Sequence, residues 1–296
     1  MMELPTKAAS SLESRALGMA LGHAVGDAFG ATREFAEPDP TFSHTEIVGG
    51  GTFGWRAGQP TDDTDLAMIV LRSMPSRTEF DLKAMRSLLI EWHECEPIDI
   101  GVTIRQAIVR LKRGAALGGD PETHSEANGS LMRVAGLSLL DLPWMPPFLK
   151  ILEDQTRLTH GHENCVLADR ILISGLRAGL RGGDRKEVIR AMRLSAHGNK
   201  WPFDISGVAT LSWDQLPTTG WVCDTLHAAF WSIVNCRSFE EAMVKLAARG
   251  GDADTTCAVA GALFGSFSGV DNLPTRWLNV IEAKEEIEHL VESLLR

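Results

Sequence analysis

The sequence contains no tyrosine and only five cysteines in 296 residues, none of them in a C-x-x-C pair. Eight tryptophans partly fill the aromatic role that tyrosine usually shares. An odd number of widely spaced cysteines argues against a zinc site and against a disulfide framework. We therefore expect the protein to work in a reducing, cytoplasmic environment.

Long apolar runs and an excess of basic residues are also missing. No stretch has the length and hydrophobicity of a transmembrane span, and the first twelve residues lack the apolar region of a signal peptide. Lysine and arginine number 29 against 39 aspartates and glutamates, so the net charge is −10. Nucleic acids and anionic membranes bind through a basic footprint, and neither is expected as a partner. An acidic chain can still bind a phosphorylated small molecule through helix N-termini or a divalent metal.

The apolar residues recur with helical periodicity, and the alternation typical of strands is scarce. The buried stretches are crowded with glycine, alanine and serine, which permits tight helix crossing. We predict an all-α fold, a single compact multi-helix orthogonal bundle that forms one domain over residues 1–296. The periodicity places helices at residues 12–29, 61–71, 80–95, 98–111, 131–140, 148–158, 165–180, 186–194, 220–235, 239–248, 255–267, 272–281 and 283–295.

The first of these helices carries glycine at every fourth position, at Gly18, Gly22, Gly26 and Gly30. This spacing lines one helix face with residues that have no side chain. Because glycine costs helix stability, the pattern indicates that something approaches this face closely, either another helix or a ligand. Close packing against a second helix is the favoured interpretation.

Two acidic motifs stand at the starts of apolar helices. Thr61-Asp62-Asp63-Thr64-Asp65 precedes one, and Asp252-Ala253-Asp254-Thr255 precedes another behind a pair of glycines. Acids at a helix start are usually caps or complements of the helix dipole, and for either motif alone this interpretation is favoured. Three acids within four residues exceed what capping requires, and a bound cation would offset their repulsion. If the two helix starts meet, their four carboxylates and two hydroxyls suit a hard divalent ion.

Two other polar stretches are weaker signals. Asn128-Gly129-Ser130 precedes the predicted helix over residues 131–140, where free backbone N–H groups could hold a phosphate. An ordinary turn with Ser130 as a cap explains the stretch equally well. His160 and His162 are two residues apart in a predicted loop, and without a third histidine or a cysteine nearby, hydrogen bonding is a better explanation than metal binding.

Taken together, these motifs resemble those of the ADP-ribosylglycohydrolase family, which includes the dinitrogenase reductase-activating glycohydrolases and the ADP-ribosyl-acceptor hydrolases. The order and spacing of the two acidic motifs are the specific part of the resemblance, which covers nearly the whole chain. The matching stretches are Gly22 to Gly30 followed by Glu34-Phe35, Thr61 to Thr64, Asn128 to Arg133, Leu158 to His162, Gly220 to Leu226 and Gly250 to Thr255.

The resemblance implies a centre of two Mg²⁺ or Mn²⁺ ions and hydrolysis of the bond between ADP-ribose and an acceptor. The acceptor is expected to be a protein arginine, so the partner is an ADP-ribosylated protein or an ADP-ribosyl small molecule. Glu34 matches an acid near the metals, and it is the expected catalytic group together with Asp62 and Asp254. The residues implied as metal ligands are Thr61, Asp62, Asp63, Asp252, Asp254 and Thr255.

For substrate binding, the resemblance implies that Asn128, Gly129 and Ser130 cradle the diphosphate and that His160 contacts the ligand. Trp221 stands where the family often has tyrosine, so adenine stacking and core packing are equal alternatives for it. Two other functions stay open. One is a relative that binds ADP-ribose or a nucleotide without catalysis, and the other is a hydrolase of a small ribosyl or phosphate metabolite.

Overall fold

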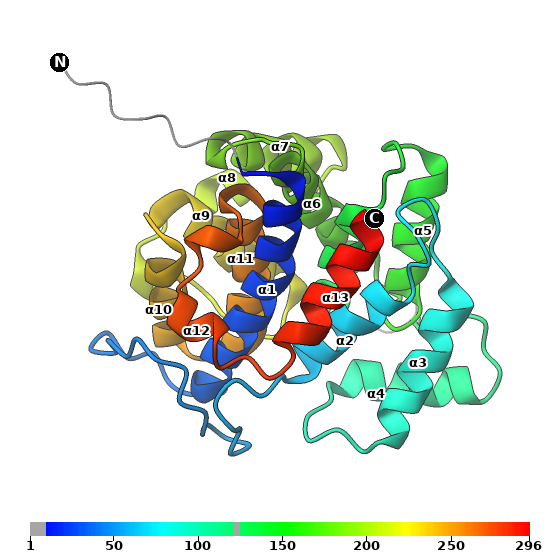
Figure 1. Cartoon of the computed structure of the whole chain (residues 1–296), viewed down its shortest axis with the longest axis horizontal. Coiled ribbons are helices and arrows are strands. Elements are labelled where there is room, and N and C mark those ends of the chain that lie inside the picture. The colour runs from blue at the N-terminus through cyan, green and yellow to red at the C-terminus, as the bar shows by residue number, and fades with distance from the viewer. Residues whose placement is uncertain (1–9, 121–124) are drawn as a thin grey trace.

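The computed structural model describes residues 10–120 and 125–296, and in these ranges the chain forms helices without a named β-strand (Figure 1). The all-α prediction is therefore confirmed, whereas the single domain over residues 1–296 stays a prediction. The α-helices are α1 (Leu12–Gly30), α2 (Asp62–Arg72), α3 (Leu82–Glu94), α4 (Val102–Lys112), α5 (Pro146–Arg157), α6 (Glu163–Leu180), α7 (Arg185–Gly198), α8 (Ile205–Val208), α9 (Val222–Asn235), α10 (Phe239–Arg249), α11 (Ala253–Ser268), α12 (Thr275–Leu278) and α13 (Lys284–Leu295). Short 3₁₀ turns are η1 (Ala31–Arg33), η2 (Val134–Leu139), η3 (Trp213–Gln215) and η4 (Val270–Asn272).

The centre of the fold is the antiparallel pair of α1 and α11, which lie side by side in Figure 1. The glycine face of α1 lies against the backbone of α11, as the four-residue spacing predicted. A Cβ placed on Gly22 would lie 2.5 Å from the carbonyl oxygen of Gly261, and one on Gly26 would lie 2.1 Å from that of Cys257. Only glycine permits so close an approach, so this face of α1 fixes the distance between the two helices.

The same pair of helices positions the acidic motifs. The last residue of α1, Gly30, lies against Ala253 and Asp254, because a Cβ there would be 2.2 Å from the carbonyl oxygen of Ala253. The C-terminal end of α1 therefore meets the N-terminal end of α11. η1 then leads directly from α1 to Glu34.

The expected helix over residues 131–140 is wrong. The segment is a turn followed by the 3₁₀ helix η2. The buried side chain of Arg133 donates from Nη1 to the carbonyl oxygen of Gly129 at 3.1 Å. An α-helix would use that carbonyl for the backbone N–H four residues later, and the guanidinium competes for it.

Several other helix boundaries differ from the expectation, among them the end of α7, which extends to Gly198 instead of residue 194. The helix predicted over residues 98–111 begins only at Val102, after Gly101 in an extended conformation, so Asp99 lies in a loop. The helix predicted over residues 272–281 shrinks to η4 and the four residues of α12. Within the described ranges, none of the helices is both long enough and apolar enough to cross a membrane.

Candidate active site and metal centre

The first turn of α2 is fixed to α1 by one buried carboxylate, Asp27. Thr61 donates to it from its backbone N–H at 3.1 Å and from its hydroxyl at 2.8 Å, and the N–H and hydroxyl of Thr64 donate to its Oδ2. Burial raises the pKa of Asp27 to about 6, although these hydrogen bonds oppose the shift. Asp27 thus acts as an anchor that holds the acidic start of α2 against α1.

Thr61 caps α2 as predicted, since its hydroxyl accepts from the N–H of Asp63 at 3.2 Å. The start of α11 reaches the same place from the other side, where the Thr255 hydroxyl donates to Oδ2 of Asp63 at 3.1 Å. The two helix starts therefore meet. Each threonine oxygen still has a free lone pair for a further ligand.

The carboxylates of Asp62, Asp63 and Asp254 are all buried. Burial first, and then the neighbouring carboxylates, raises the pKa of each well above its usual range. Oδ1 of Asp63 and Oδ1 of Asp254 have no hydrogen-bond partner among the described residues. Buried, unpaired acidic oxygens are costly, so this arrangement requires protons or cations.

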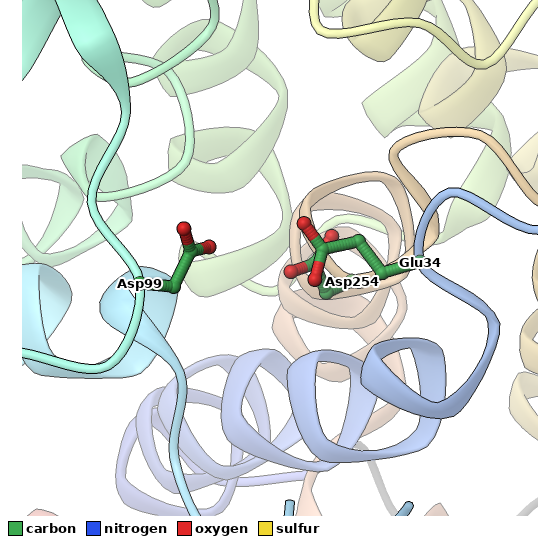
Figure 2. A group of neighbouring side chains, drawn as sticks. All are labelled: Glu34, Asp99 and Asp254. Carbon is green, nitrogen blue, oxygen red and sulfur yellow. The ribbon is translucent and has the colours of Figure 1, made fainter. Parts of the chain in front are cut away.

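Glu34 and Asp99 complete the acidic cluster with Asp254 (Figure 2). Each of the three offers a carboxylate oxygen, and these oxygens lie within 4.8 Å of one another. Glu34 follows η1, Asp254 lies in the first turn of α11, and Asp99 faces both from the loop between α3 and α4. Burial, followed by repulsion from Asp99 and Asp252, raises the pKa of Glu34 to about 8. Its Oε2 has no partner among the described residues.

Asp99 is the functional candidate that sequence reasoning missed. Helical periodicity carried the predicted helix over it, although Pro97 and Gly101 mark a break on either side. Burial and then the nearby charge of Asp252 raise the pKa of Asp99. An acid between two helix breaks was the signal that could have identified this loop position.

An open cleft of about 210 Å³ lies over the acidic cluster, and we call it the first cleft. Asn128 connects the wall of this cleft to the second acidic motif, because its Nδ2 donates to Oδ2 of Asp252 and to the Thr225 hydroxyl, both at 2.8 Å. Gly129 lines the cleft beside His160, and a Cβ there would lie 2.9 Å from the imidazole Cε1. Close contact of this loop with the histidine therefore requires glycine at that position.

His160 is buried, and burial lowers its pKa to about 3, so the imidazole is neutral. Its Nδ1 lies 2.8 Å from the Thr159 hydroxyl, and its Nε2 has no partner among the described residues. His162, in contrast, accepts the N–H of Asn164 at the start of α6. The hydrogen-bonding role that the sequence favoured over metal binding is thus seen for His162.

The remaining two candidates lie away from the cleft lining. The Ser130 hydroxyl donates to Oδ1 of the buried Asp169 at 3.4 Å, and Ser130 is not among the residues that line the cleft. Trp221 is 36% exposed and is therefore not a core residue. Its ring packs edge to face on Phe203 at 4.9 Å, and its Nε1 donates to Glu126 at 2.9 Å.

The donor set of the cluster is suited to a divalent cation. Every available atom is a carboxylate or hydroxyl oxygen, and such sets suit hard ions such as Mg²⁺ and Mn²⁺. Two facing acids with raised pKa values beneath an open cleft are also typical of enzymes that hydrolyse glycosidic bonds. An all-helical fold with this acidic centre at its helix ends is compatible with a hydrolase, and comparison with known proteins identifies the family.

The ADP-ribosylglycohydrolase family model matches residues 8–296. The chain is 30% identical to ADP-ribosylarginine hydrolase Tri1 of Pseudomonas putida (strain GB-1), over 95% of this chain and 77% of that protein. It is 29% identical to the ADP-ribosyl-[dinitrogen reductase] glycohydrolase of Rhodospirillum rubrum, over 96% and 97% of the two chains. A solved ADP-ribosylglycohydrolase-related protein complex superposes with a TM-score of 0.82 at 32% identity, over 96% of this chain and 98% of that one. The chain belongs to the ADP-ribosylglycohydrolase family.

Proposed function

We propose that this protein is a metal-dependent hydrolase that removes ADP-ribose from arginine side chains of proteins. The proposal is supported by its similarity to relatives that are named as an ADP-ribosylarginine hydrolase and a dinitrogen reductase glycohydrolase. The observation that carries it is the buried carboxylate cluster below the first cleft, with oxygens that lack partners among the described residues. So many acids can share one site only if protons or cations neutralise them.

We propose that two Mg²⁺ or Mn²⁺ ions bind at the meeting point of α2 and α11. When bound, the cations would neutralise the acids, orient the ribose hydroxyls and supply Lewis acidity to water. The proposed ligands are Thr61, Asp62, Asp63, Asp252, Asp254 and Thr255. Asp27, which is already saturated by four hydrogen bonds, holds the ligand helix without joining the ligands.

The two facing acids, Glu34 and Asp99, would have different roles toward the substrate. Glu34 lines the first cleft, and its Oε2 has no partner among the described residues, so its carboxyl group would exchange a proton with the reacting groups. Asp99 stands opposite it in Figure 2 and offers a carboxylate to the cationic guanidinium of the acceptor. Positive charge that develops at the anomeric carbon would be stabilised by the same acids.

The far wall of the first cleft suits the diphosphate. In our proposal the Thr159 hydroxyl donates to Nδ1 of His160, which leaves the single N–H of the neutral ring at Nε2. That unpaired donor and the loop of Asn128, Gly129 and Ser130 would bind phosphate oxygens, while the backbone N–H of Asn128 donates to the carbonyl oxygen of Gly220 at 3.1 Å. Trp221, half-exposed near this loop, would stack on the adenine.

The test is release of ADP-ribose from an arginine-modified protein with Mg²⁺ or Mn²⁺, followed by chelation. Asp62→Asn and Asp254→Asn should each abolish metal binding in calorimetry and lower kcat/KM by at least about 10³-fold, because each removes a charged ligand. Asp81→Asn is the matched control, since Asp81 also starts a helix but only caps it, with bonds to the N–H groups of Lys83 and Ala84.

Three outcomes would contradict the proposal. Undiminished turnover in both ligand variants would refute the ligand assignment. Undiminished turnover after chelation would refute the metal dependence. Tight calorimetric binding of ADP-ribose without release from any arginine, serine or free conjugate would instead identify a binding protein. Turnover of a panel of small ribosyl and phosphate metabolites tests the remaining alternative, which is a hydrolase of such a metabolite.

A further inference from the structure

A second cleft opens on the other side of the acidic cluster. It has a volume of about 280 Å³, and it shares Asp62 and Asp99 with the first cleft. The loop that carries Asp99 runs between the two clefts. A substrate whose scissile bond lies at Asp99 would therefore have one cleft on either side of that bond. The wall of the second cleft includes Trp55, Asp65, Trp92, Glu96 and Ile98.

The composition of this wall is aromatic and acidic, and none of its described residues is lysine, arginine or histidine. Nε1 of Trp92 donates to Oδ2 of Asp65 at 3.0 Å, which fixes the indole in place. Trp55 is 6% exposed, and its Nε1 has no partner among the described residues. A buried donor without a partner is unusual in a native protein, so this wall contains an unused hydrogen-bond donor.

Glu96 is the exposed acid of the second cleft, and its backbone is unusual. It follows the end of α3 with φ at 52°, in the left-handed region that glycine favours at this position. Its N–H donates to the carbonyl oxygen of His93 at 3.3 Å, which holds it in this conformation. A glycine would be unstrained here, so Glu96 can be removed in a way that relaxes the backbone.

We propose that the second cleft binds the acceptor polypeptide and takes a lysine or arginine side chain that neighbours the modified arginine. The inference rests on the proposed function, because it places ADP-ribose in the first cleft and the scissile bond at Asp99. The acceptor chain then continues into the second cleft. Glu96 holds the cationic head of this lysine or arginine. The aliphatic stem of the same substrate side chain lies along Trp92 and Ile98.

Three substrates test this assignment with the metal-loaded enzyme. They are ADP-ribosylarginine as the free amino acid, a peptide with lysine beside the modified arginine, and the same peptide with glutamate there. We expect kcat/KM to favour the lysine peptide over the glutamate peptide by about fivefold, as exposed charge pairs allow. Glu96→Gln should reduce this preference below about twofold and leave the free amino acid unchanged.

A matched control and a strain-relieving variant sharpen the test. Glu94→Gln should keep the preference, because Glu94 is an equally exposed acid of α3 that pairs with Lys112 at 2.9 Å and lies outside the cleft. Glu96→Gly should lose the preference and yet melt at or above the wild-type temperature. Loss of preference in a variant that is not destabilised separates recognition from folding.

Binding can also be followed without turnover, through Cys95. This residue lines the second cleft and is exposed, whereas the other four cysteines are buried. Unmodified arginine-lysine peptide should slow the reaction of Cys95 with a thiol reagent, and ADP-ribose alone should not. The same reaction rate with and without this peptide would overturn the inference, as would an equal preference in wild type and Glu96→Gln.

The two proposals fail in different ways. If the free amino acid is hydrolysed and the peptides are not distinguished, the second-cleft assignment is wrong and the proposed function stands. If no arginine conjugate is hydrolysed, the proposed function is wrong, and protection of Cys95 by the peptide still decides whether the cleft binds basic polypeptide.

Discussion

The glycine face of α1 permits a test in which two effects of one methyl group have opposite signs. Gly26→Ala lies inside a helix, where alanine normally stabilises by about 0.5–1 kcal/mol relative to glycine. At this position the added Cβ would lie 2.1 Å from the carbonyl oxygen of Cys257, against 3.4 Å for ordinary contact. The deficit is 3.4 − 2.1 = 1.3 Å, and it falls on backbone that cannot rotate away.

Overpacking of this kind typically costs about 1–3 kcal/mol, so the steric effect exceeds the gain in helix propensity. We expect a net loss of about 1–2 kcal/mol, which lowers Tm by roughly 2–8 °C for a chain of this size. Separation of α1 from α11 also moves Asp27 away from Asp254. Activity on ADP-ribosylated arginine should therefore fall by at least about tenfold even at temperatures where the variant is folded.

Calorimetric melting and steady-state kinetics of the same preparations would measure both effects. Gly198→Ala is the matched control, because Gly198 ends α7 and a Cβ there would meet no atom within 4 Å. The control should melt within about 1 °C of wild type or slightly above it. A Gly26→Ala protein that behaves like the control would refute the conclusion that this glycine sets the helix separation.

Three other predictions concern the acids and the cleft rim. Asp63→Asn should raise the Tm of the metal-free protein, because it removes one of several repelling buried acids, and should abolish the upward shift of Tm that we expect Mn²⁺ to produce in wild type. Glu34 has a folded pKa of about 8, raised from 4.5, so the folded state binds its proton more tightly. Metal-free stability should therefore fall as pH rises from about 4.5 to 8, and urea denaturation of Glu34→Gln should show a weaker fall. Trp221→Ala should raise KM for ADP-ribosyl substrates by about fivefold with kcat retained, whereas Trp221→Phe should stay near wild type; equal KM values would place adenine elsewhere.

The central features of the fold were predictable because their signals are local. Glycine at every fourth position removes side chains from one helix face. Because glycine costs helix stability, this pattern indicates that another backbone lies close to that face. The identity and direction of the partner were not accessible in the same way. Gly261 and Gly265 in α11 supply the matching surface more than two hundred residues later, and pairing them with α1 requires the tertiary structure.

The acidic motifs were informative for a similar reason, since clustered acids at helix starts exceed the needs of capping. What could not be predicted is the direction of individual side chains. The Ser130 hydroxyl donates to the buried Asp169, and the Arg133 guanidinium donates to the Gly129 carbonyl in a turn where a helix was expected. Asp99 was missed because helical periodicity was extended through Gly101, where the real helix only starts. Such choices depend on buried partners contributed by distant elements.

The contact between Asp63 and Thr255 also has a consequence for how the protein is made. The hydrogen bond joins residues 192 positions apart, so the site closes a very long loop. Closure of such a loop costs roughly 5 kcal/mol of chain entropy, which must be offset by the packing of α1 on α11. A nascent chain whose Asp252 is still inside the ribosome has only two of the four carboxylates that are proposed as metal ligands. The proposed metal site can therefore be complete only after α11 has been synthesised and has packed against α1.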